Sequence, residues 1–195
     1  MLSLSRIGLQ TTVLLLIGLF ALGAGRPHAN QQASPPSRTE PSPDDAERES
    51  LRGLAGVEVL VDPLDSEIEQ AGLTTGKLQQ DIQQRLQKAG VKVLTERERI
   101  ASPATGVLIV RVETLHDRIG RYFYTTDLLL AQQVQLETHA GLEFSAVTWK
   151  KLGSVSTVAD DNVKHLEDQA LRKIDQFIKD YLNVNPDRKV TDPRR

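Results

Sequence analysis

The sequence predicts a single α+β domain: a mixed, mainly antiparallel sheet of about five strands with two helices on one face. Two patterns lead to this prediction. Apolar residues recur with helical spacing in segments 75–89 and 163–182, whereas between residues 107 and 158 they alternate with the period of a strand. A short apolar run, 57–61, precedes the first helical segment. The predicted order is β-α-β-β-β-β-α, and residues 51–186 form one domain by length.

The first strand and the first helix belong to a predicted βαβ unit. Run 57–61 places apolar side chains on both faces, which favours an interior position in a sheet. Gly90 suits the left-handed position that ends a helix, and 91–94 then resumes an extended run. The helix between them, 75–89, has one apolar face, made of Leu78, Ile82, Leu86 and Ala89.

The middle of the chain reads as a series of antiparallel strands. Residues 107–115 alternate well enough for one strand, and 122–136 form a longer strand with one wet face. Residues 139–141 make the turn into a partner strand, 142–151. A short extended piece, 154–158, continues that strand beyond a bulge.

The second helix closes the domain. Asp160 or Asp161 is expected to cap its first turn, because a carboxylate accepts hydrogen bonds from free backbone N–H groups. Pro186 ends the helix, and a flexible charged tail follows at 187–195. The predicted buried stripe consists of Val163, Leu166, Ala170, Ile174, Phe177, Ile178, Tyr181 and Leu182.

Residues 1–29 have the pattern of an export signal. A short start with one basic side chain, Arg6, leads into an uncharged apolar run from 7 to 25. We expect either a cleaved signal peptide or an uncleaved N-terminal membrane anchor, and both place the rest of the chain outside the cytoplasm, in the periplasm or beyond. Residues 30–50 are rich in proline and serine and predict a disordered linker.

Composition excludes several classes of function. The chain has no cysteine, so it has no disulfides, thiolate zinc sites or cysteine nucleophile. Its net charge is −2 without a dense basic stripe, which argues against nucleic-acid binding. Membrane contact is expected only through the N-terminal segment. The chain has four histidines, which lack the close spacing of metal ligands: His28, His116, His139 and His165.

No catalytic, cofactor-binding or metal-binding residue is predicted. The serines lie in no known nucleophile motif, and the acidic loop with Asp62, Asp65 and Glu67 lacks the spacing of a calcium loop. The expected interaction surface contains Phe123 and Trp149, whose parity points outward from the sheet. An open alternative is that Trp149 belongs to the core.

The segment 175–186 ends in F-I-x-D-Y-L-x-x-N-P, from Phe177 to Pro186. It resembles the last helix of a group of uncharacterised secreted bacterial proteins. The predicted element order also looks like ferredoxin-like layouts of envelope assembly and transport components. These resemblances imply a bacterial, exported protein and carry over no active-site residue.

Two functions therefore remain open. The first is a non-enzymatic envelope module that binds another protein or a small ligand through an uncovered sheet face. The alternative is a periplasmic hydrolase or metal-dependent enzyme whose residues converge only in three dimensions. A deep pocket that brings His116 or His139 near two carboxylates would favour the enzyme.

Overall fold

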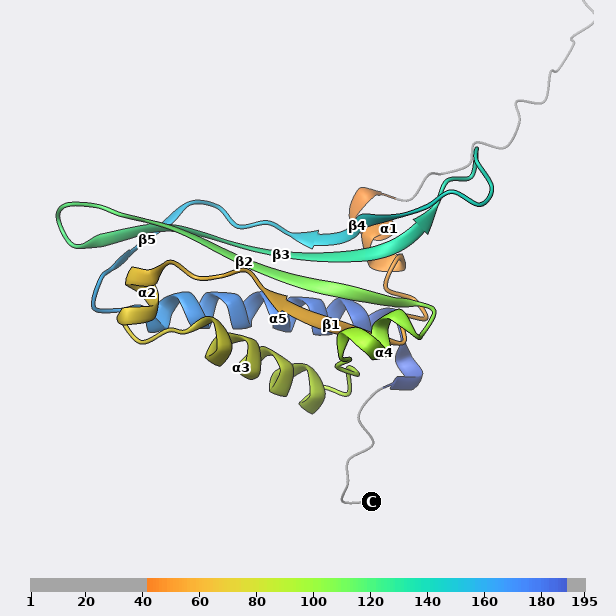
Figure 1. The fold of residues 1–195 in the computed structure, drawn as a ribbon, viewed down its shortest axis with the longest axis horizontal. Coiled ribbons are helices and arrows are strands. Elements are labelled where there is room, and N and C mark those ends of the chain that lie inside the picture. Colours follow the sequence, from red (N-terminus) through yellow and green to blue (C-terminus); the bar gives the residue numbers. More distant parts are fainter. Residues whose placement is uncertain (1–41, 189–195) are drawn as a thin grey trace, which may run out of the picture. The chain divides into compact units, whose positions relative to one another are not determined.

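The computed structural model describes residues 42–188. The predicted signal, 1–29, and the linker up to residue 41 lie outside the described residues, as do residues 189–195 of the predicted tail. The described part is an α+β domain with a mixed sheet, which confirms the predicted fold class (Figure 1).

The sheet has five strands in the described part of the chain. β1 pairs with β2 in parallel, and all other pairs are antiparallel, so the sheet is mixed and mainly antiparallel as predicted. The spatial order is β1-β2-β3-β4, and β5 pairs with β3 next to the part that β4 occupies. The strands are β1 Gly56–Val61, β2 Thr105–His116, β3 Arg121–Gln135, β4 Glu143–Lys151 and β5 Ser156–Ala159.

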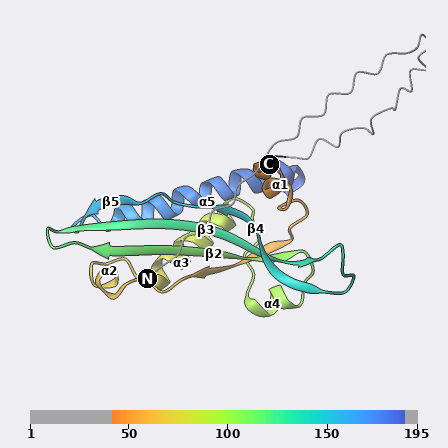
Figure 2. The ribbon, with the colours of Figure 1, turned by 90° about the horizontal axis from the view of Figure 1, so that it is seen from above.

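Both predicted helices are present and pack on one face of the sheet (Figures 1 and 2). α3, Thr75–Lys88, starts after the capping hydroxyl of Thr74 and ends before Gly90, whose φ is +82°. α5, Lys164–Val184, buries most of the predicted stripe, and Ile178 and Leu182 are half-buried against the core. Two ion pairs join the helices: Arg85 Nε to Asp175 Oδ1 at 2.6 Å and Lys77 Nζ to Glu167 Oε1 at 2.6 Å.

β1 is not the interior strand that its apolar residues predicted. It lies at the edge of the sheet, and only Val57 is bridged on its outer side, by Val93. The predicted strand at 91–94 is reduced to this one bridge. Val57 and its alternate neighbours face the helices, whereas Leu60 is 44% exposed on the other side. Its apolar second face therefore marks an open surface rather than an interior position.

The predicted caps of the last helix are also wrong. α5 begins only at Lys164, after Val163, and no side-chain hydrogen bond caps it. The backbone of Asp160 instead donates to the carbonyl of Gly120 in the β2–β3 hairpin, at 3.2 Å. Val163 is buried and takes the place of a polar cap.

Three short helices were not predicted: α1 Pro43–Glu49, α2 Ser66–Gln70 and α4 Glu96–Ile100. α1 lies in the stretch expected to be linker, so the ordered part begins before residue 50. Ser42 caps it through a hydrogen bond from the N–H of Asp45, and α1 buries no residue of its own. The short 3-10 turn Pro186–Arg188 likewise extends order into the predicted tail.

The core lies between the sheet and α3 and α5. β2 and β3 contribute alternate residues, the even-numbered ones from 108 to 112 and from 122 to 130, which confirms the predicted inward face over these ranges. The predicted face does not stay buried to its end, since Leu136 is 40% exposed. We call this side the helix-covered face and the other the open face. The largest fully buried side chains are Trp149, Tyr181, Phe177, Leu51, Leu54, Ile68, Leu78, Ile82, Leu86, Leu108, Leu128 and Leu130.

Candidate functional site

An apolar band crosses the open face of the sheet. Strand register places Leu60 beside Ile109 and Ile109 beside Leu129. A second row of the band, one step along the strands, consists of Val107, Ala131 and Val147. Leu60 and Val147 are 44% and 51% exposed, and the other four residues are half-buried. Water therefore reaches aliphatic side chains in two neighbouring rows, each of which crosses three strands.

Paired charges border the band. Arg111 Nε lies 2.9 Å from Asp62 Oδ2, and that hydrogen bond raises the pKa of Arg111. On the other side, Arg99 Nε lies 2.5 Å from Glu58 Oε2. Because each of these charges already has a counter-ion in the same molecule, a partner can cover the band without leaving a lone charge at these borders.

A groove of about 460 Å³ continues the band at one end of the sheet. One wall comes from Arg99 and Ile100 at the end of α4 and from Ala104, whose φ of +53° lies in the left-handed region. The carbonyl of Ala104 is fixed there by the N–H of Ala55, at 2.6 Å. The other lining residues include amides, a hydroxyl and a carboxylate: Gln133, Gln135, Ser145, Glu143 and Gln132, whose amide oxygen already accepts from the hydroxyl of Thr148.

This lining combines aliphatic contact with hydrogen-bonding groups of both kinds. Side-chain amides donate and accept, so they match the N–H and C=O groups of an extended peptide or a small polar ligand. The groove could not be predicted from the sequence alone because one of its walls is α4, a helix that was not predicted. A signal for that helix is present, since Thr95 and Glu98 form a capping box.

Phe123, one of the two predicted surface residues, lies on the open face at the opposite end of β3. It is half-buried beside Leu115 and Val155, which are 70% and 71% exposed. The guanidinium carbon of Arg121 lies 5.7 Å from the centre of its ring. Phe123 thus belongs to a second, smaller apolar patch.

Trp149, the other predicted surface residue, is core. It is only 1% exposed, packs edge-on against Phe177 at 5.1 Å between ring centres, and donates from Nε1 to Asp180 Oδ2 at 3.2 Å. Its parity was misjudged because β4 contains a bulge: Trp149 pairs with Leu130 and Val147 with Ala131, so Thr148 is the extra residue. The structure does not bring Trp149 and Phe123 together.

His116 does lie near two carboxylates. Its Nδ1 is 3.2 Å from Glu67 Oε2 and its Nε2 is 3.9 Å from Asp160 Oδ2, and its ring stacks on Tyr122 with 4.5 Å between centres. Burial, followed by the charges of Glu67, Asp160 and Asp65, raises the pKa of Tyr122. The side chains of His116, Glu67 and Asp160 are 35%, 58% and 52% exposed, so the cluster is a surface feature rather than a deep pocket.

The other histidines lie apart from this cluster. His139 is in the β3–β4 loop beside Thr138, and His165 is in α5 beside Gln169. His28 lies outside the described residues. Within residues 42–188, three or more histidine, aspartate or glutamate side chains nowhere converge as metal ligands would. In the acidic loop, Asp65 caps α2.

No helix in the described range 42–188 combines the length and apolarity needed to cross a bilayer. No family model matches the chain, and no curated protein shows significant similarity to it. A proposal about function therefore has to rest on the geometry of the open face and on the sequence.

Proposed function

We propose that this protein is an exported, non-enzymatic module of the bacterial cell envelope that binds another protein or a small ligand through the open face. The observation that carries the proposal is the continuity of the apolar band with the groove. The basic start and apolar run in residues 1–29, and the resemblance of segment 175–186 to secreted bacterial proteins, support export.

The band and the groove contribute differently to binding. Covering the half-exposed side chains of Leu60, Val107 and Val147 removes apolar surface from water and supplies affinity. The amides of the groove supply orientation, because a ligand that leaves them unpaired loses hydrogen bonds to water without replacement. Such a division between an apolar centre and polar positioning groups is typical of binding sites.

The hydrolase alternative has one supporting observation, the position of His116 between Glu67 and Asp160. All three side chains are substantially exposed to solvent. Catalysis by fixed charges is strongest where water is excluded, so this geometry favours binding over catalysis.

A photo-crosslinking amino acid in place of Ile109, which lies in the band between Leu60 and Leu129 and away from the β4 edge, tests the proposal in the bacterial envelope. We expect it to capture one defined partner, and the added substitution Leu60→Glu to abolish capture. Ile119→Glu is the matched control, because Ile119 is 73% exposed but lies in the β2–β3 hairpin, away from the band. Equal capture by both variants would overturn the proposed site. Export is tested separately, by cell fractionation and N-terminal sequencing of the native protein.

A further inference from the structure

β4 forms the edge of the sheet, and only part of this edge is covered. The C-terminal half lies against α1: Ser50 Oγ donates to the carbonyl of Thr148 at 3.1 Å, and Glu47 lies 4.0 Å from Lys150 Nζ. The N-terminal half, 143–147, pairs with β3 and with no other strand of the described residues. Four of its five residues are exposed, and Ala146 is half-buried. This half presents unpaired backbone groups to a further strand.

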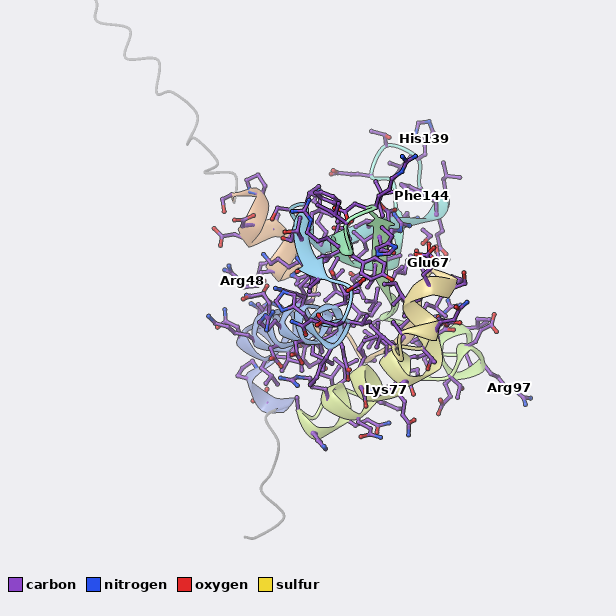
Figure 3. All side chains as sticks on the ribbon, turned by 90° about the vertical axis from the view of Figure 1, so that its left-hand side faces the viewer. Arg48, Glu67, Lys77, Arg97, His139 and Phe144 are labelled. Carbon is purple, nitrogen blue, oxygen red and sulfur yellow. The ribbon has the colours of Figure 1, made fainter. Side chains whose placement is uncertain are left out.

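The hairpin that contains this edge extends beyond the helices (Figures 1 and 3). Phe144 is 41% exposed, and Leu142 and Leu136 near the turn are 51% and 40% exposed. Two-stranded hairpins are marginal in water, and a third strand or another covering element stabilises them. The hairpin thus combines an open edge with uncovered apolar side chains.

We propose that a second copy of this chain covers the edge, with the two β4 strands pairing antiparallel around a two-fold axis at Ser145. In this register Phe144 of each copy lies opposite Ala146 of the other, so a large side chain meets a small one. Ser145 lies opposite its own counterpart, and Glu143 lies opposite the second copy's Val147. Every pair keeps its side chains on the same face of the joined sheet, as antiparallel pairing requires.

Charge complementarity supports the same register. The side chains on the open-face side of β4 are Glu143, Ser145 and Val147, followed beyond the bulge by Lys150. Glu143 therefore lies diagonally across from Lys150 of the second copy, and the two-fold axis repeats this pair. Among residues 42–188 Glu143 has no ion-pair partner, and Lys150 has only the 4.0 Å contact with Glu47. Diagonal neighbours in a sheet lie within reach of long side chains.

The bulge and α1 limit the contact to these five residues. Because the axis is perpendicular to the sheet, the open faces of both copies lie on the same side. Their apolar bands and grooves then form one continuous surface with two equivalent sites.

Charge substitution at Ser145 tests the register. Ser145→Glu and Ser145→Lys each place like charges opposite one another at the axis, so each variant is expected to be monomeric by sedimentation velocity while the native protein is dimeric. An equimolar mixture of the two variants is expected to restore the dimer. Gln133→Glu, on the open face of neighbouring β3, is the control and is expected to remain dimeric. All variants are expressed as the full chain and purified after any processing of the N-terminal segment that the cell carries out.

A single-cysteine variant provides an independent test, since the chain has no cysteine of its own. Directly opposite Cα atoms in antiparallel strands lie about 4.5–5.5 Å apart, within the range of a disulfide. Ser145→Cys is expected to form a covalent dimer on mild oxidation, and Gln133→Cys is not. A monomeric native protein, a dimer that persists in both charged variants, or equal oxidation of the two cysteines would overturn the proposal. A monomer that binds phosphatidylcholine vesicles only when Phe144 is present would overturn it in favour of a lipid surface.

Discussion

The two faces of the sheet carry similar aliphatic side chains in very different surroundings. Leu108 and Leu130 face the helices and are fully buried, whereas Ile109 and Leu129, each one position away, face outward and are only half-buried. The difference comes from α3 and α5, which cover one side only. Apolar residues on the covered side contribute to folding. Those on the open side remain available to a partner.

The largest expected contrast is between Trp149 and Val147, which lie on opposite faces of the same strand. Trp149→Ala removes a fully buried ring and its hydrogen bond to Asp180, so we expect a loss of about 3–5 kcal/mol in the free energy of unfolding. Val147→Ala removes half-exposed atoms and should cost less than about 1 kcal/mol. Urea unfolding followed by far-UV circular dichroism measures both variants. Tryptophan fluorescence cannot be used, because Trp149 is the sole tryptophan and one variant removes it. Equal losses would mean that the faces do not differ as described.

The next effect concerns the junction between β4 and β5. A Cβ atom on Gly153 would lie 2.6 Å from the carbonyl oxygen and 2.9 Å from the nitrogen of Thr126. Neither backbone atom can move aside without breaking the sheet, so Gly153→Ala should destabilise the protein by about 1–3 kcal/mol. In α3 a Cβ on Gly76 meets nothing within 4 Å, and Gly76→Ala should raise stability by up to about 1 kcal/mol. Thermal unfolding separates the two, and a neutral Gly153→Ala would contradict the contact.

Features with a local pattern could be predicted from the sequence. The periodicity of α3 and α5 and the alternation in β2 and β3 follow from side-chain spacing within one element, and all four are present. Whether β1 is an edge strand or an interior strand depends on which segment pairs with its far side. The spacing of residues within 57–61 carries no information about that pairing. An apolar residue on the outward face of β1 fits an open surface as well as it fits an interior strand.

The candidate site shows the same limit. Phe123 was placed correctly by alternation, whereas a single extra residue, Thr148, reversed the parity of Trp149. The groove depends on α4 and on the left-handed Ala104, which lie far in sequence from the glutamines of β3. Its assembly is a tertiary effect, because the antiparallel pairing of β2 with β3 sets the start of β2, directly after Ala104, beside Ala131 and Gln132.

A smaller prediction concerns one flaw in the helix-covered face. Thr126 is 3% exposed, and its hydroxyl is the one buried side-chain polar atom of residues 42–188 that lacks a hydrogen-bond partner. Thr126→Val keeps the shape and removes the unsatisfied group, so stability should rise by about 1 kcal/mol. Thr125→Val on the open face should change it by less than about 0.5 kcal/mol. The midpoint of urea unfolding measures both variants, and a destabilised Thr126→Val would show that the hydroxyl is satisfied.

The smallest expected effect is a loss of stability in acid that depends on a carboxylate of the helix layer and not on carboxylates of the open face. Glu69 of α2 accepts hydrogen bonds from the backbone N–H of Thr75, at 3.0 Å, and from its hydroxyl, at 2.8 Å. These two bonds lower the pKa of Glu69 below its ordinary value of 4.5. A carboxyl group with a lower pKa in the folded state stabilises the fold above its unfolded-state pKa. That contribution is lost as the pH falls through the folded-state pKa.

We therefore expect the native protein to lose more stability between about pH 5 and pH 3 than Glu69→Gln does, because the amide keeps an acceptor oxygen but cannot titrate. Melting temperatures at the two pH values give the difference. Glu113→Gln on the open face is the matched control and should lose as much as the native protein. The same acid loss in Glu69→Gln as in the control would show that the start of α3 does not depend on this charge, and that acid acts alike on both sides of the sheet.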